Sequence, residues 1–150
     1  MNAPAPSGAH DAVVTGTVTS EAGRFVVSAR SNHFVTDSRL AGREAVHAGE
    51  LLLAALTSCA MANFEHNAAL DGLPVGGIVA RAAHTRGAVD PTRYDSTVLE
   101  IEVRGVGQDD AMALARKFVA ACPIYNTIER GSGIELTING QPLTDRRSVG

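Results

Sequence analysis

The segment from Ala48 to Leu70 constrains the fold most, because it is predicted to form one long helix that is apolar on nearly every side. Residues 51–61 carry no charge, and Asp71-Gly72-Leu-Pro74 ends the helix with a glycine and a proline. A helix that is apolar all round must be buried all round. At roughly 20 residues it is about 30 Å long, which one small domain struggles to cover with a few strands. We therefore expect the helix to lie at the interface of a homodimer.

The rest of the chain combines short strands with a second helical region. Segments of alternating or continuous apolar character predict strands at residues 13–19, 24–30, 32–36, 78–86, 96–103 and 134–138. A second helix is predicted over residues 108–121, capped by the cluster Gln108-Asp109-Asp110, and a third over residues 123–130. This order of elements indicates an α+β fold. We expect one domain over residues 12–140, a disordered tail at residues 1–11 and a second tail at residues 141–150.

Composition argues against several partners. The formal net charge is -3 at pH 7 and the isoelectric point is near 5.9, so basic residues are not in excess for binding nucleic acid or an anionic membrane. The N-terminal residues lack the cationic start and apolar stretch of a signal peptide. The longest strongly apolar run, residues 51–56, is too short to span a bilayer. We expect a cytoplasmic protein that binds neither nucleic acid nor membranes.

The two cysteines, Cys59 and Cys122, are the strongest chemical signal in the sequence. In a reducing compartment, cysteines are more often reactive, redox-active or simply buried than stably crosslinked. Cys59 lies in the long apolar helix, where we expect it to be buried. Cys122 directly precedes Pro123, and proline favours the first turn of a helix. Cys122 is therefore predicted at an N-cap position, where unpaired N–H groups favour the thiolate.

No metal or cofactor site is predicted. The chain has five histidines and two cysteines, yet none forms the close ligand pair that is typical of a zinc site. His66 lies seven positions after Cys59, which is about 10 Å along a helix and too far for a Cys-His dyad. We interpret His66 as structural.

These motifs together resemble one known family. The run Glu50-Leu-Leu-Leu-Ala-Ala-Leu-Thr-Ser-Cys59, followed by Cys122-Pro123-Ile124 and Glu135-Leu-Thr-Ile138, resembles the OsmC/Ohr family of osmotically induced and organic hydroperoxide resistance proteins. The resemblance implies an intertwined homodimer with an antiparallel sheet, a central buried helix and a broken second helix. It also implies that Cys59 is the peroxidatic cysteine, which attacks the hydroperoxide. Cys122 would then resolve the resulting sulfenic acid by forming a disulfide.

Members of that family also use an arginine and a glutamate near the first cysteine, which the resemblance assigns to Arg39 and Glu50. Arg24 and Arg30 are alternatives, because Ohr-type members take their arginine from the first hairpin, and the choice between the OsmC and Ohr types stays open. Glu50 and Cys59 are nine positions apart, which puts them on opposite sides of a helix and about 13 Å apart along it. If Glu50 serves a Cys59, the second chain of a dimer is its natural donor.

The chemistry of the residues agrees with the resemblance. Peroxide reduction needs a thiolate, a cation that holds it and a second thiol that removes the sulfenic acid. The N-cap argument alone makes Cys122 the more acidic thiol, but an arginine beside Cys59 can outweigh an effect of about 1 kcal/mol. We expect a thiol-dependent peroxidase that reduces organic hydroperoxides and is regenerated by a dithiol reductant. The alternative is a non-enzymatic dimer of the same fold that binds a small lipophilic molecule at its apolar interface.

Overall fold

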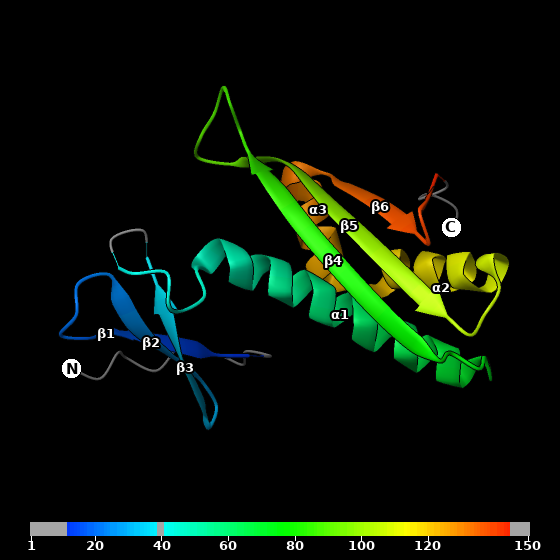
Figure 1. The fold of residues 1–150 in the computed structure, drawn as a ribbon, viewed down its shortest axis with the longest axis horizontal. Coiled ribbons are helices and arrows are strands. Elements are labelled where there is room, and N and C mark those ends of the chain that lie inside the picture. The colour runs from blue at the N-terminus through cyan, green and yellow to red at the C-terminus, as the bar shows by residue number, and fades with distance from the viewer. Residues whose placement is uncertain (1–11, 39–40, 145–150) are drawn as a thin grey trace. The chain divides into compact units, whose positions relative to one another are not determined.

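The computed structural model describes residues 12–38 and 41–144, so the predicted tail at residues 1–11 lies outside the described part. The described residues form a mixed α+β fold, as predicted, with three helices and two sheets (Figure 1). The chain divides into two compact units, residues 1–51 and residues 52–150.

The first unit contains a three-stranded antiparallel sheet. Its strands are β1 (Val14–Val18), β2 (Arg24–Ala29) and β3 (Asn32–Asp37), in that spatial order, which confirms the predicted hairpin and third strand. Among the described residues of this unit only Thr36 and Asp37 are buried, and Val18 is 81% exposed. The described part of this sheet therefore has no buried apolar core of its own.

The second unit combines a four-stranded sheet with helices. The strands β4 (Gly77–Arg86), β5 (Tyr94–Arg104), β6 (Ile134–Ile138) and β7 (Gln141–Pro142) follow one another across the sheet. Helix α1 (Ala48–Leu70) begins in the first unit and continues into the second, and α2 (Gln108–Ala121) and α3 (Pro123–Ser132) connect β5 to β6. β5 and β6 are parallel, in contrast to the expected antiparallel sheet, because such a helical crossover returns the chain in the same direction. The short strand β7 was not predicted.

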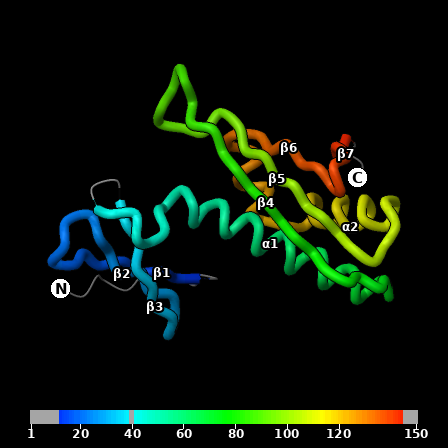
Figure 2. The backbone as a smooth tube through the Cα atoms, viewed as in Figure 1, coloured from blue at the N-terminus to red at the C-terminus, as the bar shows by residue number. Residues whose placement is uncertain are grey.

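The core of the second unit lies between the sheet and the helices, which stand behind the sheet in the tube drawing of Figure 2. Phe64 of α1, Leu99 of β5, Phe118 of α2 and Leu136 of β6 are all buried in it. The rings of Phe64 and Phe118 lie 5.9 Å apart. These contacts pack the middle of α1 against α2, so the segments that carry Cys59 and Cys122 belong to one core.

Among the described residues, helix α1 buries one face. Leu56, Ala60, Phe64 and Ala68, each four residues after the last, form its buried stripe, which is the spacing of a single helix face. In contrast, Leu52 is 39% exposed and Met61 is 37% exposed. The burial on all sides that the sequence predicts is therefore not reached within the described part of one chain, and apolar side chains on both flanks of the buried stripe are left partly exposed.

The start of α2 also differs from the prediction. Its N-cap residue is Gly107, which makes no side-chain capping bond, while the Gln108 side-chain amide donates to the Ile138 carbonyl over 2.9 Å. Asp109 and Asp110 lie in the first turn, where their charge suits the helix dipole. The predicted cap was therefore wrong, although the helix begins and ends at the predicted residues.

Candidate redox site

A disulfide between Cys59 and Cys122 joins α1 to the junction of α2 and α3. The two residues are 63 positions apart in the sequence, and their Cα atoms are 6.8 Å apart. The pairing is the one that the family resemblance implied. The structure thus holds the two thiols of the chain in their joint oxidised form.

Cys122 lies at the N-cap position predicted from Pro123. Its Sγ accepts a hydrogen bond from the backbone N–H of Tyr125 over 3.4 Å, while Pro123 occupies the start of α3. The Cys122 N–H also donates to the Phe118 carbonyl, which closes α2. The Asn126 side-chain amide donates to the carbonyl of Cys122 over 2.9 Å. The Cys122 sulfur is therefore held by a rigid junction that donates an N–H to it.

The two cysteines differ in burial, in the opposite order to the one expected. Cys122 is fully buried in the same core as Phe118 and Tyr125, whose rings lie 5.2 Å apart. Cys59 is only partly buried, because it stands next to Ala60 of the buried stripe of α1 and not on the stripe itself. The expectation that Cys59 is buried was wrong, and Cys59 is the more exposed residue of the two.

Glu50 lies in the first turn of α1, where its carboxylate accepts a hydrogen bond from the backbone N–H of His47 over 2.8 Å. This contact is one half of a capping box. Glu50 also lines a cavity of about 510 Å³ together with Ala41, Arg43, Ala45 and His47. Glu50 therefore combines a helix-capping contact with a position on a polar cavity in the first unit.

The three arginines considered from the sequence have different settings. Arg39 lies outside the described residues. Arg30 is exposed at the turn between β2 and β3, with a left-handed φ of 57°. The Arg24 guanidinium contacts the carboxylates of Glu21, Asp37 and Glu44 at 2.8–2.9 Å. The pKa of Arg24 is raised, chiefly by its hydrogen bonds to Asp37 and then Glu44, so this cation is already bound by acids of its own unit.

Sequence reasoning missed Asp37 and Arg43. Asp37 is paired with Arg24 across β2 and β3, and the signal for it was available, because the two residues are equidistant from the two-residue turn Arg30-Ser31. Arg43 lies between the predicted strand at residues 32–36 and the long helix, and only the structure shows it on the same cavity as Glu50.

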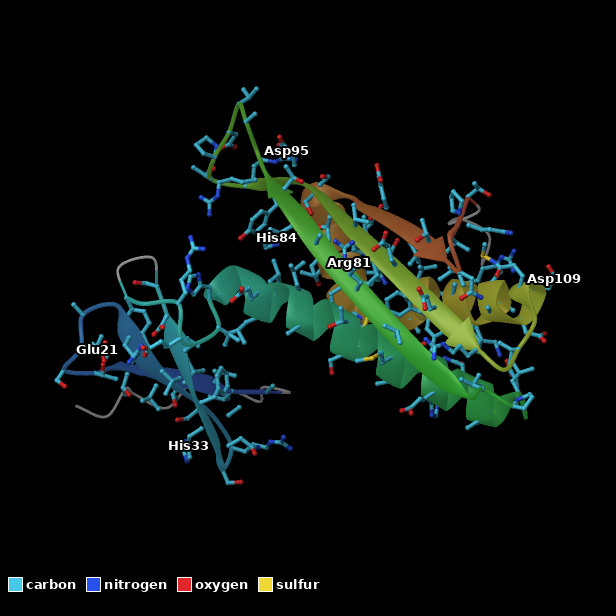
Figure 3. All side chains as sticks on the ribbon, in the orientation of Figure 1. Glu21, His33, Arg81, His84, Asp95 and Asp109 are labelled. Atoms are coloured by element: carbon cyan, nitrogen blue, oxygen red, sulfur yellow. A yellow bond between two sulfur atoms is a disulfide. The ribbon has the colours of Figure 1, made fainter. Side chains whose placement is uncertain are left out.

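The remaining histidines of the described part have separate settings. His66 is exposed on α1. In Figure 3 His84 projects from β4, and its ring stacks on Tyr94 at 3.7 Å, with its pKa lowered by burial and then by Arg86. Within residues 12–38 and 41–144, no group of three or more His, Cys, Asp or Glu side chains could hold a metal. No helix in the described ranges has the length and apolar character to cross a bilayer.

The fold is similar to that of several proteins of known structure. The structure is similar to an OsmC-like protein from Mycoplasma pneumoniae, with 15% sequence identity, a TM-score of 0.74 and coverage of 87% of this chain and 95% of that chain. It is also similar to an organic hydroperoxide resistance protein OsmC from Legionella pneumophila, with 17% identity, a TM-score of 0.69 and coverage of 88% and 98%. The organic hydroperoxide resistance protein OhrB of Bacillus subtilis has 14% identity, a TM-score of 0.66 and coverage of 87% and 98%.

The structural similarities, at these low identities, concern the fold alone. Comparison with curated protein sequences finds no match. The sequence profile of the OsmC-like protein family, however, matches residues 41–137, which is more than half of the chain and includes both cysteines. The chain therefore belongs to the OsmC-like protein family.

Proposed function

We propose that the protein is a thiol-dependent peroxidase that reduces organic hydroperoxides. The observation that carries this proposal is the disulfide between a partly exposed cysteine, Cys59, and a fully buried one, Cys122. The Cys59 thiolate attacks the terminal oxygen of the hydroperoxide, which breaks the O–O bond and leaves Cys59 as a sulfenic acid. The departing alkoxide takes up a proton and leaves as the alcohol.

The second step uses Cys122. Its thiol attacks the Cys59 sulfur, the disulfide forms, and the sulfenic oxygen leaves as water. The N–H of Tyr125 at the Cys122 sulfur favours the thiolate form in this attack. One thiol of a dithiol reductant then attacks the Cys59 sulfur, and Cys122 departs as a thiolate that the same N–H stabilises. The second thiol of the reductant attacks its own sulfur in this mixed disulfide, which releases Cys59 as a thiolate and leaves the reductant as a disulfide. The difference in burial thus assigns the roles. The more exposed Cys59 reacts with the hydroperoxide and the reductant, whereas the buried Cys122 is the attacking group when the disulfide forms and the leaving group when it is reduced.

The remaining site residues are proposed to act between two chains. Glu50 and Cys59 stand nine positions apart on α1, so they face opposite sides of the helix about 13 Å apart along it. In a homodimer, Glu50 of one chain therefore serves Cys59 of the other. Arg39 is proposed as the cation that holds the Cys59 thiolate, since Arg24 is already bound by three carboxylates.

Organic hydroperoxides suit this protein better than hydrogen peroxide. Leu52 is partly exposed and lies seven positions before Cys59, on the same side of α1, and an apolar surface there lowers the cost of binding a lipophilic substrate. The names of the similar Legionella and Bacillus proteins also refer to organic hydroperoxide resistance. The same apolar face supports the second candidate, a non-enzymatic dimer that binds a lipophilic molecule.

Cysteine variants test the proposal. With cumene hydroperoxide and excess dithiol, Cys59→Ser is expected to abolish turnover, because the nucleophile is lost. Cys122→Ser is expected to permit one attack and then to accumulate sulfinic or sulfonic Cys59, which mass spectrometry detects. Equal multi-turnover rates in the wild type and Cys59→Ser would end the peroxidase proposal and leave the binding protein as the surviving candidate.

A further inference from the structure

The junction between α2 and α3 contains a carbonyl that the backbone of its own helix cannot satisfy. In a continuous α-helix, the carbonyl of Val119 accepts a hydrogen bond from the backbone N–H four positions later. That position is held by Pro123, which has no N–H. Val119 belongs to the buried core, where an unpaired carbonyl costs free energy. The proline that separates the two helices therefore also creates a need for a donor from elsewhere.

Asn126 of α3 supplies that donor. Its side-chain Nδ2 donates to the Val119 carbonyl over 3.0 Å and to the Cys122 carbonyl over 2.9 Å. The first acceptor lies in the last turn of α2 and the second at the junction, so one amide group bridges the two helices. The backbone N–H of Asn126 also donates to the Cys122 carbonyl, over 3.1 Å. Asn126 thus fixes the direction in which α3 leaves α2, with Cys122 at the point where the chain turns.

Cys122 depends on this junction most when the disulfide is open. In the oxidised structure the bond to Cys59 holds the Cys122 sulfur directly, but the proposed reaction starts from the reduced thiols. The Cα atoms of the two cysteines are 6.8 Å apart and Cys122 is fully buried, so the approach of its thiol to Cys59 depends on the shape of the junction. A misplacement of about 1 Å can slow a reaction by about 100-fold. Contacts that keep the junction in shape therefore affect the rate at which the disulfide forms.

We propose that Asn126 is a positioning residue for the resolving step, which keeps the Cys122 thiol in reach of oxidised Cys59. This inference rests on the proposed function, and all three residues belong to the second unit. In the resolving step, the Cys122 thiolate attacks the sulfur of the Cys59 sulfenic acid, the S–S bond forms, and hydroxide leaves and takes up a proton to become water. In the competing step, the Cys59 sulfenate attacks a second hydroperoxide, the O–O bond breaks, and a sulfinate and an alcohol form. Asn126 is thereby expected to protect Cys59 from overoxidation.

The partition between these two steps tests the proposal in the full-length protein. Reduced wild-type protein and Asn126→Leu are treated with a series of cumene hydroperoxide concentrations, and mass spectrometry measures the disulfide and the sulfinic form of Cys59. Leucine is a better helix former than asparagine, but its side chain donates no hydrogen bond. The hydroperoxide concentration that overoxidises half of Cys59 is expected to fall about tenfold. The rate constant for the first attack by Cys59 is expected to stay unchanged, because the side-chain acceptors of Asn126 lie on α2 and at its end.

Asn67→Leu is the matched control. Asn67 is a half-buried asparagine of the second unit, as Asn126 is, and its Nδ2 also donates to the carbonyl four positions earlier, that of Asn63, over 2.9 Å. It lies on α1, eight positions after Cys59, so the change removes the same kind of bond away from the junction. The partition in Asn67→Leu is expected to match the wild type.

If Asn126→Leu does not fold, Asn126→Ser replaces it. A serine hydroxyl can donate to the carbonyl four positions earlier, which is that of Cys122, but it is too short to bridge to Val119 as well. Overoxidation at a lower hydroperoxide concentration than in the wild type supports the proposal, and a wild-type partition in this variant overturns it.

Two results with Asn126→Leu would overturn the positioning role. One is a wild-type partition in the folded variant, and the other is an equal shift in Asn67→Leu, which would make the shift a general effect of a lost hydrogen bond. Failure of the proposed function has a different signature, namely no reaction of wild-type Cys59 with hydroperoxide. In that case the equilibrium between the dithiol and disulfide forms in glutathione buffers still tests the position of Cys122. A smaller equilibrium constant for disulfide formation in Asn126→Leu than in Asn67→Leu supports the positioning role, and equal constants refute it.

Discussion

Reduction of the Cys59–Cys122 disulfide is predicted to lower the thermal stability of the protein markedly. The bond joins residues 63 positions apart, and both lie in the second unit, where α1, α2 and α3 meet. For a loop of this length, the entropy that the bond removes from the unfolded chain corresponds to about 4 kcal/mol. In a chain of 150 residues, that difference in the free energy of unfolding shifts Tm by about 8–16 °C.

Differential scanning calorimetry of the oxidised and reduced protein measures this shift, with the redox state of each sample checked by mass spectrometry. Cys122→Ser provides the control, because it cannot form the bond and should unfold at one temperature with or without reductant. The same shift also reports the reaction, since an organic hydroperoxide added to the reduced protein should restore the higher Tm. Equal Tm values for fully oxidised and fully reduced protein would refute the reasoning.

Three further outcomes are expected. The protein should sediment as a dimer at micromolar concentration, and Leu52→Glu, which places a charge at an exposed apolar position of α1, should weaken the dimer; a folded wild-type monomer would contradict this. Arg24 and the backbone N–H groups of Ala45 and Glu44 hold the pKa of Asp37 at about 2, below the usual 3.8, so Asp37 stabilises the fold above about pH 4 and loses this effect as the pH falls toward 2. Urea unfolding across that range should show a smaller pH dependence in Asp37→Asn. Phe118→Ala should lower the free energy of unfolding by about 3–5 kcal/mol, because its buried ring packs against Phe64 and Tyr125, and a loss below about 1 kcal/mol would contradict that packing.

Much of the fold could be predicted because local signals mark its boundaries. Asp71-Gly72 ends α1, and Pro123 separates α2 from α3, so the bounds of α1 and α2 agree with the prediction. β7 has only two residues, which is too short for a periodic pattern. The parallel pairing of β5 with β6 follows from the path of the two helices and not from either strand.

The candidate site could be predicted only in part. The Cys122-Pro123 motif revealed the N-cap, because that interaction is local. The burial of the two cysteines could not be predicted in the same way. Because α1 is apolar on nearly every side, its pattern does not show which of its faces packs against the core. Arg43 was missed for a similar reason: an arginine between two elements has no periodic signal, and its place on the cavity with Glu50 is seen only in the folded chain.

The most direct test of the central claim is the product of one reaction. Fully reduced protein is mixed with one equivalent of an organic hydroperoxide per chain, quenched by thiol alkylation and analysed by peptide mass spectrometry. We predict one equivalent of alcohol and a Cys59–Cys122 disulfide within the chain, with Cys59→Ser producing neither. Unreacted hydroperoxide beside two free, alkylated cysteines would contradict the account.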